Sequence, residues 1–233
     1  MPMSAGEVRQ ALQELEDLRY AAGNLDEALR RIVLATHRLF AVDGAGLMLV
    51  DPDQLLRNVA VSDKRVHHLE DLQIEHGEGP GVDAFEEKTM VDSADLTGED
   101  RWPSFCPAAV DRGLRAVLAS PIPYNQHAIG VVAVFSAKVR PWSPEGELAL
   151  ITFTDLAALC IANTMASEER GEVAEQLQRA LDARVVIEQA KGALVAREGL
   201  TERDAFERMR RQARRERRPI VEVATEVMTA LRS

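Results

Sequence analysis

The chain has 233 residues, of which 46% are hydrophobic and 28% charged, and its formal net charge is -10. This composition predicts a globular protein of one or two domains and excludes a chain that is disordered throughout. The N-terminal residues lack the cationic flank and apolar stretch of a secretion signal, and no uninterrupted apolar run approaches the ~18 residues of a membrane span. We therefore expect a cytoplasmic protein. Its two cysteines, Cys106 and Cys160, have no metal-ligand spacing and indicate reduced thiols.

The charge is distributed unevenly along the chain. Residues 1–171 contain 15 Lys and Arg against 27 Asp and Glu, whereas residues 172–233 contain 13 against 11. Within the second part, "RDAFERMRRQARRERR" (203–218) has eight arginines and three acids. The sequence thus predicts an acidic body followed by a basic tail domain.

The first part of the chain contains both helical and strand patterns. Residues 4–23 repeat apolar side chains every three or four positions, which predicts an amphipathic helix within 1–24, and residues 25–40 predict a second helix. Short β-branched runs predict four strands, the last two joined as a hairpin, at 44–50, 55–61, 115–124 and 128–137. The stretch 75–105 is rich in glycine, proline and acids and predicts loops and short turns.

From Ser143 onward the pattern is helical. Ser143 is a candidate N-cap, with Glu145 and Glu147 in the first turn. Only Gly171 interrupts the helical pattern before it resumes. We expect a long helix joining the two halves, with a break near Gly171 and a helical coiled-coil linker over 166–180.

The order helix, strand, strand, loop, strand, strand, helix resembles a GAF domain over residues 25–165. Three motifs carry the resemblance to the GAF domains of actinobacterial regulators: "GEGP" (77–80), "DLTGEDRWPSF" (95–105) and "GVVAVFS" (130–136). The resemblance implies an antiparallel sheet with flanking helices. It also implies a domain that senses a small-molecule or protein signal and pairs with a second copy through its terminal helices.

The candidate signal-binding residues are Asp95, Arg101 and Trp102 of the long loop, although a tryptophan beside a proline equally fits a packing role. Relatives commonly have cysteine after "GEGP", where this chain has Gly81, so the residue for thiol chemistry at that position is missing. No catalytic triad, metal-ligand cluster or cofactor motif is evident in the sequence. We therefore expect no enzyme, and the alternative is a cysteine-dependent redox enzyme like the related methionine sulfoxide reductases.

The tail predicts three short helices. Gly199 can end the first in the left-handed conformation, and Thr201 with Asp204 forms a capping-box pattern at the start of the second. One face of the second helix is apolar: Ala205, Phe206, Met209 and Ala213. Arginines cover the rest of it: Arg203, Arg208, Arg210, Arg211, Arg214, Arg215 and Arg218. Pro219 can open the third helix, whose inward stripe is Ile220, Val223, Ala224, Val227 and Leu231.

Residues 181–228 resemble an ANTAR domain, an RNA-binding antitermination module. The resemblance rests on "RVVIEQAKG" (184–192), Ala205-Phe206 and Val223-Ala224, in that order. It implies a three-helix RNA-binding domain over 181–233. The predicted fold class is thus α+β, an N-terminal GAF domain joined by a long helix to a C-terminal ANTAR domain.

Arginine's planar fork suits phosphates and unpaired bases, which favours RNA over a merely solvated face. Arg184 and Lys191 are seven residues apart and lie about 20° from each other around a helix, so both can meet one stretch of phosphates. Lys191 equally fits a stem packed beside Ile187 and Leu194. Gly192 is costly inside a helix and serves either close approach of RNA or close packing of a helix. The predicted RNA-binding residues are Arg184, Gln189, Lys191, Gly192, Arg197, Arg208, Arg211, Arg214, Arg215 and Arg218.

Together these patterns predict a cytoplasmic, homodimeric regulator with no membrane segment. A signal at the GAF domain would control how the arginine surfaces bind two hairpins in a leader transcript, which prevents a terminator from forming. The alternative is a helix-turn-helix DNA-binding transcription factor, because the second and third tail helices follow each other closely.

Overall fold

The computed structural model describes residues 25–166 and 172–230. The helix predicted within 1–24 and the break predicted near Gly171 lie outside the described residues. The chain divides into two compact units, an α/β unit and a helical unit that contains the chain from Glu175 onward.

The α/β unit is built on a five-stranded sheet with the strand order β2-β1-β5-β4-β3. The strands are β1 Gly44–Val50, β2 Leu56–Val61, β3 Val91–Ser93, β4 Ala116–Tyr124 and β5 His127–Ser136. Strands β1 and β5 are buried along almost their whole length, as expected for a sheet covered on both faces. The four predicted strands are confirmed.

The fifth strand, β3, corrects the prediction of an irregular stretch over 75–105. It pairs antiparallel with β4, and Val91 lies opposite Ala119. A strand of three residues is too short to produce an alternating pattern in the sequence, so its pairing is decided by the sheet.

The predicted hairpin between β4 and β5 is confirmed. Tyr124 pairs with His127, and Asn125 takes the left-handed conformation with φ 55°, which asparagine tolerates. Further along β5, a Cβ atom at Gly130 would lie 2.3 Å from the carbonyl oxygen of Met48. Glycine is therefore required at this position, where β5 pairs with β1.

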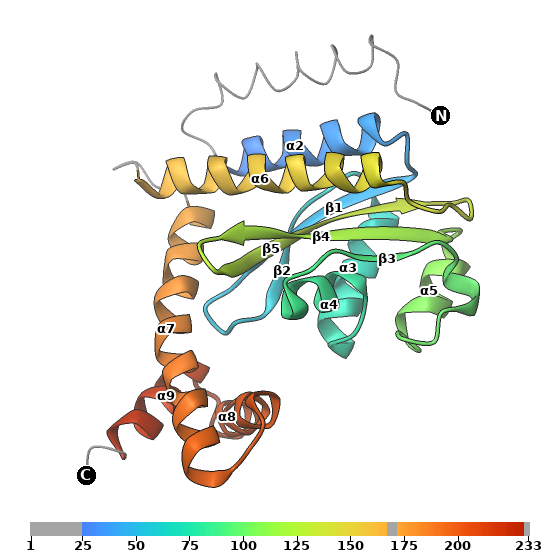
Figure 1. Ribbon diagram of the computed structural model, residues 1–233. Coiled ribbons are helices and arrows are strands. Elements are labelled where there is room, and N and C mark those ends of the chain that lie inside the picture. The colour runs from blue at the N-terminus through green and yellow to red at the C-terminus, as the bar shows by residue number, and fades with distance from the viewer. Residues whose placement is uncertain (1–24, 167–171, 231–233) are drawn as a thin grey trace. The chain divides into compact units, whose positions relative to one another are not determined.

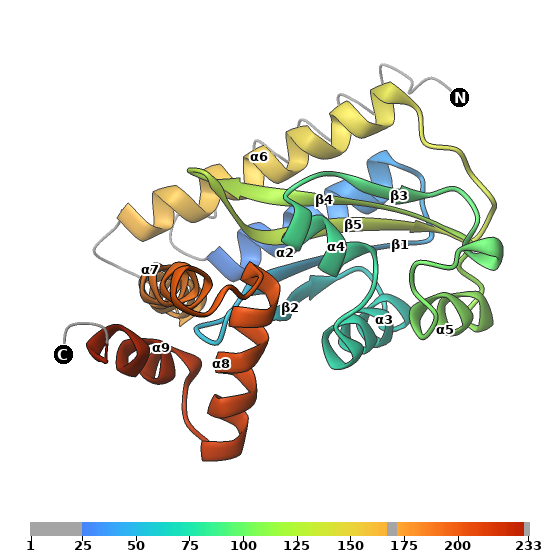
Figure 2. The ribbon, with the colours of Figure 1, turned by 60° about the horizontal axis from the view of Figure 1, so that its bottom comes forward.

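Helices cover both faces of the sheet (Figures 1 and 2). One face carries α2 (Leu25–Leu39) and α6 (Pro144–Ala166), side by side; the helix predicted at 25–40 is confirmed. The other face carries α3 Lys64–His76, α4 Pro80–Glu87 and α5 Phe105–Asp111. These three helices were not predicted from the sequence; α4 replaces part of the loop predicted over 75–105, and α5 begins at the last residue of that stretch. At eight and seven residues, α4 and α5 span only two turns, too few for a helical period to be recognised.

Helix α6 begins as predicted. The hydroxyl of Ser143 accepts a hydrogen bond from the Gly146 N–H at 3.2 Å, and Glu145 and Glu147 occupy the first turn. By length and composition α6 is apolar enough to cross a membrane, and 33% of its apolar stretch is buried. It packs against α2 and β4. This helix thus has an apolar face beyond what the described residues bury.

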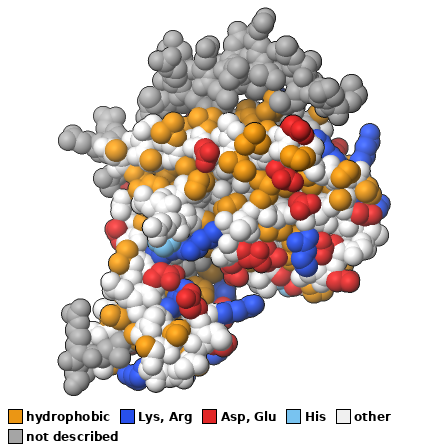
Figure 3. All heavy atoms as spheres, in the orientation of Figure 1, with side chains coloured by type: hydrophobic (Ala, Val, Ile, Leu, Met, Phe, Trp, Pro, Cys, Tyr) orange, Lys and Arg blue, Asp and Glu red, His pale blue; other side chains and the backbone are white. Residues whose placement is uncertain are grey.

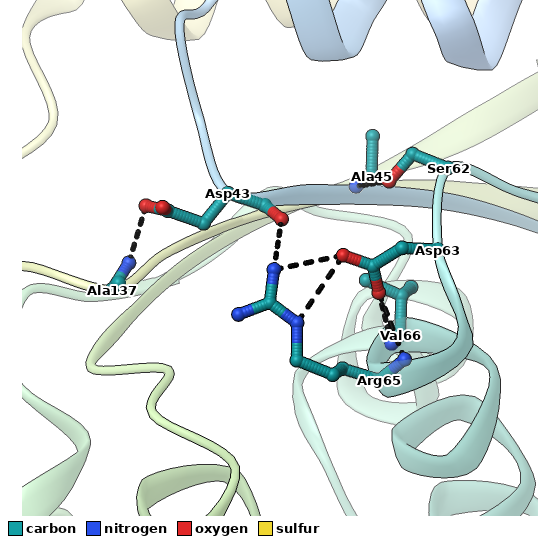
Figure 4. Close-up of polar contacts among 7 residues, drawn as sticks. All are labelled: Asp43, Ala45, Ser62, Asp63, Arg65, Val66 and Ala137. Atoms are coloured by element: carbon teal, nitrogen blue, oxygen red, sulfur yellow. Dashed lines mark hydrogen bonds and ion pairs between the residues drawn. The ribbon is translucent and has the colours of Figure 1, made fainter.

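The start of α3 is fixed by a capping network (Figure 4). The Asp63 carboxylate accepts hydrogen bonds from the N–H groups of Arg65 at 2.8 Å and Val66 at 3.1 Å. The Arg65 guanidinium donates to the carbonyl oxygen of Asp43 at 2.8 Å, and the Asp43 carboxylate accepts from the Ala137 N–H at 2.6 Å. These bonds tie α3 to the ends of β1 and β5 and set which of its side chains face the sheet.

The helical unit consists of α7 Glu172–Glu198, α8 Glu202–Glu216 and α9 Ile220–Thr229. Its buried core consists of Ala183, Ile187, Ala190, Leu194, Ala205, Met209, Ala213, Ile220, Val223 and Ala224. Of the predicted apolar faces, Phe206 and Val227 are only partly buried and pack against this core. Leu231 of the predicted stripe lies outside the described residues.

The predicted helix ends in this unit are confirmed with one difference. Gly199 has φ 68° after the end of α7, and the Thr201 hydroxyl accepts from the Asp204 N–H at 3.1 Å. The Asp204 carboxylate accepts from that hydroxyl at 2.7 Å, so only half of a capping box forms.

Candidate functional site

The outward face of α8 is an arginine surface, which we define as Arg203, Arg211, Arg214 and Arg215. All four are exposed because the burial of Ala205, Met209 and Ala213 turns this side of the helix away from the core. Arg203, Arg211 and Arg214 form no ion pair with any described residue, and the Arg215 guanidinium lies 3.3 Å from the Glu216 carboxylate. Most of the positive charge of this surface is therefore not paired with an acid among the described residues.

Two other predicted residues, Arg197 of α7 and Arg208 of α8, line one cleft in the helical unit together with Glu226 of α9. The Arg208 guanidinium contacts the Glu198 carboxylate, and the Arg218 guanidinium contacts Glu226. Tertiary packing thus brings Arg197 and Arg208 together and connects Arg218 to them through Glu226.

Lys191 lies elsewhere on α7, about 120° around the helix from Arg197 at 100° per residue. Its Nζ atom is 2.9 Å from the Glu188 carboxylate and 3.6 Å from that of Glu202, and its side chain is 15% exposed. Arg184, predicted to share this side of the helix, is half-buried. Arg184 and Lys191 therefore form a second basic region, separate from the cleft. In this region Lys191 forms ion pairs with Glu188 and Glu202.

Gly192 is exposed on α7, as is its neighbour Gln189. A Cβ atom built at Gly192 would have no described atom within 4 Å outside its own helix turn. Packing against the described residues of this chain therefore does not explain the glycine. Close approach by RNA to Gly192 stays a prediction.

In the α/β unit, the three predicted signal-binding residues are engaged with their neighbours. Asp95 caps the short 3-10 helix η2 (Leu96–Gly98), and hydrogen bonds from Thr97 and then Arg115 lower the pKa of its carboxyl. Arg101 pairs with Glu99 at 2.6 Å and lies over the Trp102 ring at 4.3 Å.

The predicted alternative for Trp102, a packing role, matches its surroundings. Its side chain is 1% exposed and meets the Phe105 ring edge-on, with ring centroids 6.1 Å apart. Its indole N–H donates to the Asp83 carboxylate at 2.7 Å. The ring therefore fills the core between α4 and α5, and its one polar atom has a partner.

Sequence reasoning missed the most unusual polar pair of this unit, Glu70 and Gln73 of α3. Both are fully buried, yet neither carboxylate oxygen of Glu70 nor the amide nitrogen of Gln73 has a hydrogen-bond partner among the described residues. Burial raises the pKa of the Glu70 carboxyl well above its usual value. The sequence signal for this pair is two polar residues, three positions apart, on the side of α3 that also carries its buried apolar residues. It was missed because α3 itself was not predicted.

Glycines make room for this pair. A Cβ atom at Gly46 of β1 would lie 1.8 Å from a Glu70 carboxylate oxygen, so the carboxyl occupies the place of a side chain. The side-chain carbonyl oxygen of Gln73 accepts a hydrogen bond from the Gly81 N–H at 2.7 Å. A Cβ atom at Gly81 would lie 2.6 Å from the Met48 methyl carbon, so a side chain there would displace the flexible end of Met48.

Neither cysteine resembles an activated nucleophile. Burial, followed by the nearby carboxylates of Glu99 and Glu78, raises the pKa of the Cys106 thiol to about 11. Burial likewise raises the pKa of Cys160. Since the thiolate is the reactive form, both thiols are poorly reactive at neutral pH. The described part of the chain also holds no cluster of three or more His, Cys, Asp or Glu arranged for a metal ion.

The α/β unit is similar to solved GAF structures. A GAF domain of an Acinetobacter phosphoenolpyruvate-protein phosphotransferase has a TM-score of 0.57 at 17% identity, covering 70% of this chain and 98% of that one. The corresponding Coxiella burnetii domain has a TM-score of 0.55 at 20% identity, covering 69% and 94%. The free methionine-R-sulfoxide reductase of Neisseria meningitidis has a TM-score of 0.55 at 14% identity, covering 70% and 94%. At these identities the likeness establishes the fold alone.

Comparison with curated proteins finds no match. Family models match residues 24–161 as a GAF domain and residues 175–228 as an ANTAR domain. The chain therefore belongs to the GAF domain family and joins this sensing domain to an ANTAR domain, the architecture of a regulator rather than of an enzyme.

Proposed function

We propose that the protein is a signal-responsive, RNA-binding regulator that promotes transcription antitermination. The observation that carries the proposal is the arginine surface of α8 within the matched ANTAR domain: three of its four guanidiniums are free of ion pairs with described acids. Arginine binds phosphates with a planar fork and stacks on unpaired bases. The ligand is a pair of hairpin loops in a leader transcript, held so that a terminator cannot form.

The rival function, a helix-turn-helix DNA reader, is disfavoured by the chemistry of α9. In that motif the second helix lies in the major groove and contacts base edges. Helix α9 follows α8 directly, but it contains Glu222 and Glu226 and no lysine or arginine. An acidic helix would be repelled by the phosphates that border the groove.

A thiol-based redox enzyme is the third candidate, and the surroundings of its cysteines oppose it. Gly81 has no room for a thiol without displacement of Met48, and burial raises the pKa of Cys106 to about 11. We therefore assign the GAF domain to sensing. Its fully buried Glu70 and Gln73, with unpartnered polar atoms, are the part of the domain best suited to respond to a signal.

We infer that the regulator is a cytoplasmic homodimer that pairs through α6. Leu148, Ile151 and Leu159 are 66%, 41% and 57% exposed on this helix, and their spacings of three and multiples of four put them on one side. A second α6 would cover them. Because the sequence leads from α6 into α7 within a few residues, a signal that altered α6 pairing would alter how two ANTAR domains meet two hairpins.

The test is a binding assay of the full chain with a two-hairpin RNA and a matched duplex DNA at several stated salt concentrations. We expect RNA to bind more tightly than DNA. We expect Arg211→Ala and Arg214→Ala each to weaken RNA binding and to reduce the salt slope by about 1 per lost phosphate contact. Arg112→Ala, an exposed arginine of the GAF domain, is the control and should leave binding unchanged. Equal affinity for RNA and DNA would contradict the proposal.

A further inference from the structure

A cleft in the ANTAR domain is bordered by all three of its helices and has a volume of about 200 Å³. Its floor is apolar: Leu194 of α7 is 4% exposed and Val227 of α9 is half-buried. Ala193 and Ala230 complete that lining with small side chains that leave the space open. The cleft is smaller than the roughly 300–1,000 Å³ of pockets for drug-sized ligands, and it suits one flat ring.

The rim of the cleft is charged. Arg197 and Arg208 supply two guanidiniums, both paired with the carboxylate of Glu198, and Glu226 supplies a second carboxylate. Glu226 also contacts the Arg218 guanidinium, and this hydrogen bond lowers the pKa of its carboxyl, so it is an ionised acceptor at neutral pH. An apolar floor between two cations and one hydrogen-bond acceptor is thus presented beside the arginine surface of α8.

This combination has a specific chemical complement. Guanidinium planes stack on nucleobases and bind phosphates, and a carboxylate accepts a hydrogen bond from an exocyclic amino group of a base. Duplex bases cannot enter such a cleft, because their edges are paired and their faces are stacked. An unpaired base of an RNA loop presents both its face and its edge.

We propose that this cleft receives one unpaired RNA base that carries an exocyclic amino group, and that Glu226 accepts the hydrogen bond from this group. The inference rests on the proposed RNA-binding function and adds to it a specificity-determining residue that is acidic. Arg197 and Arg208 bind the phosphates or the face of the same nucleotide. The arginine surface supplies affinity, whereas the cleft selects one loop position by its amino group.

The test is a double-mutant cycle with the full chain and a two-hairpin RNA. At each loop position in turn, the base is replaced by its analogue without the exocyclic amino group: purine riboside for adenosine, inosine for guanosine. Cytidine is replaced by the corresponding 4-deamino nucleoside. We expect one position at which this change weakens binding to the unaltered protein about tenfold or more. Glu226→Leu, which removes both acceptor oxygens, should bind the two RNAs nearly equally.

Three controls separate the acceptor role from others. Glu222→Leu removes an exposed acid one turn earlier on α9 and should retain the full response to the analogue. Arg218→Gln removes the ion pair of Glu226 but keeps its carboxylate, so the response should persist. Ala193→Leu fills the cleft and should abolish the response while circular dichroism and the thermal midpoint stay near their original values.

The outcomes distinguish this inference from the function on which it rests. If Glu226→Leu and the base analogue weaken binding independently at every loop position, the cleft does not receive the base. If binding is tight but no position responds, the inference is also wrong. If the unaltered protein fails to bind hairpin RNA at all, the proposed function itself fails. Competition by an acidic peptide at the cleft, with no effect of loop bases, would assign the cleft to a protein partner.

Discussion

Lys191 of α7 lies 3.6 Å from the carboxylate of Glu202 in the first turn of α8. The Lys191 side chain is 15% exposed and also has Glu188 at 2.9 Å, whereas Glu202 is 80% exposed, so the pair with Glu202 contributes roughly 0–1 kcal/mol. Lys191 can therefore exchange the Glu202 carboxylate for an RNA phosphate at little cost while it keeps its pair with Glu188. This geometry is compatible with both interpretations of Lys191: its stem can pack on the helix while its ammonium group binds RNA.

Glu202→Gln should strengthen RNA binding roughly two- to fivefold, because it removes a carboxylate that competes with phosphate for Lys191. Lys191→Met should weaken binding and reduce the salt slope, while its stem preserves the packing. Affinity measured over a series of salt concentrations checks both, and Glu222→Gln controls for the general loss of one negative charge. A lower thermal midpoint of Lys191→Met with unchanged affinity would assign Lys191 to the packing of α7 against α8 alone.

Gly192→Ala should raise the stability of the RNA-free protein by about 1 kcal/mol, because the site has room for a Cβ atom and alanine favours helix. Gly192→Leu should also leave the fold intact but should weaken RNA binding, since a large side chain would obstruct close approach. Thermal unfolding and the RNA assay measure the two effects. Destabilisation by Gly192→Leu without RNA would instead point to packing of a neighbouring helix.

Glu70→Gln should reduce the pH dependence of GAF stability. Burial raises the pKa of Glu70 in the folded state, so the folded protein holds this proton more tightly than the unfolded chain. The stability from this group is complete below the unfolded value and is lost as pH rises through the folded value. The thermal midpoint of the original protein should fall over this range faster than that of Glu70→Gln.

The two curves for Glu70 should converge at low pH and separate as pH rises. Glu86→Gln, which removes an exposed acid of α4, is a matched control for charge. Parallel curves at all pH values would mean that Glu70 titrates no differently in the folded and unfolded states.

Leu159→Glu on α6 should dissociate the proposed dimer, because a charge would replace a leucine whose full burial contributes about 1.5–3 kcal/mol. Light scattering over a dilution series measures the mass. Val139→Glu is the matched control, since Val139 is 53% exposed but lies outside α6. A dimer that survives Leu159→Glu would place the interface elsewhere.

The sequence by itself determined the fold class and both domain families. The four strands of six to ten residues, the Ser143 cap of α6 and the Gly199 stop of α7 all have local signals, because neighbouring residues carry the strand pattern, the capping side chain or the glycine. The arginine surface of α8 was predictable for the same reason. The helical period places these arginines on the side of α8 opposite to Ala205, Met209 and Ala213.

Only the tertiary structure decided which functional groups have partners. Strand β3 and helices α4 and α5 are too short for a period, and the placement of Glu70 against Gly46 depends on a contact between α3 and β1. The cleft joins Arg197, Arg208 and Glu226 from three helices, while Lys191 lies on another side of α7. Such pairings arise from contacts between residues far apart in the chain. They cannot be predicted from the spacing of residues along one helix.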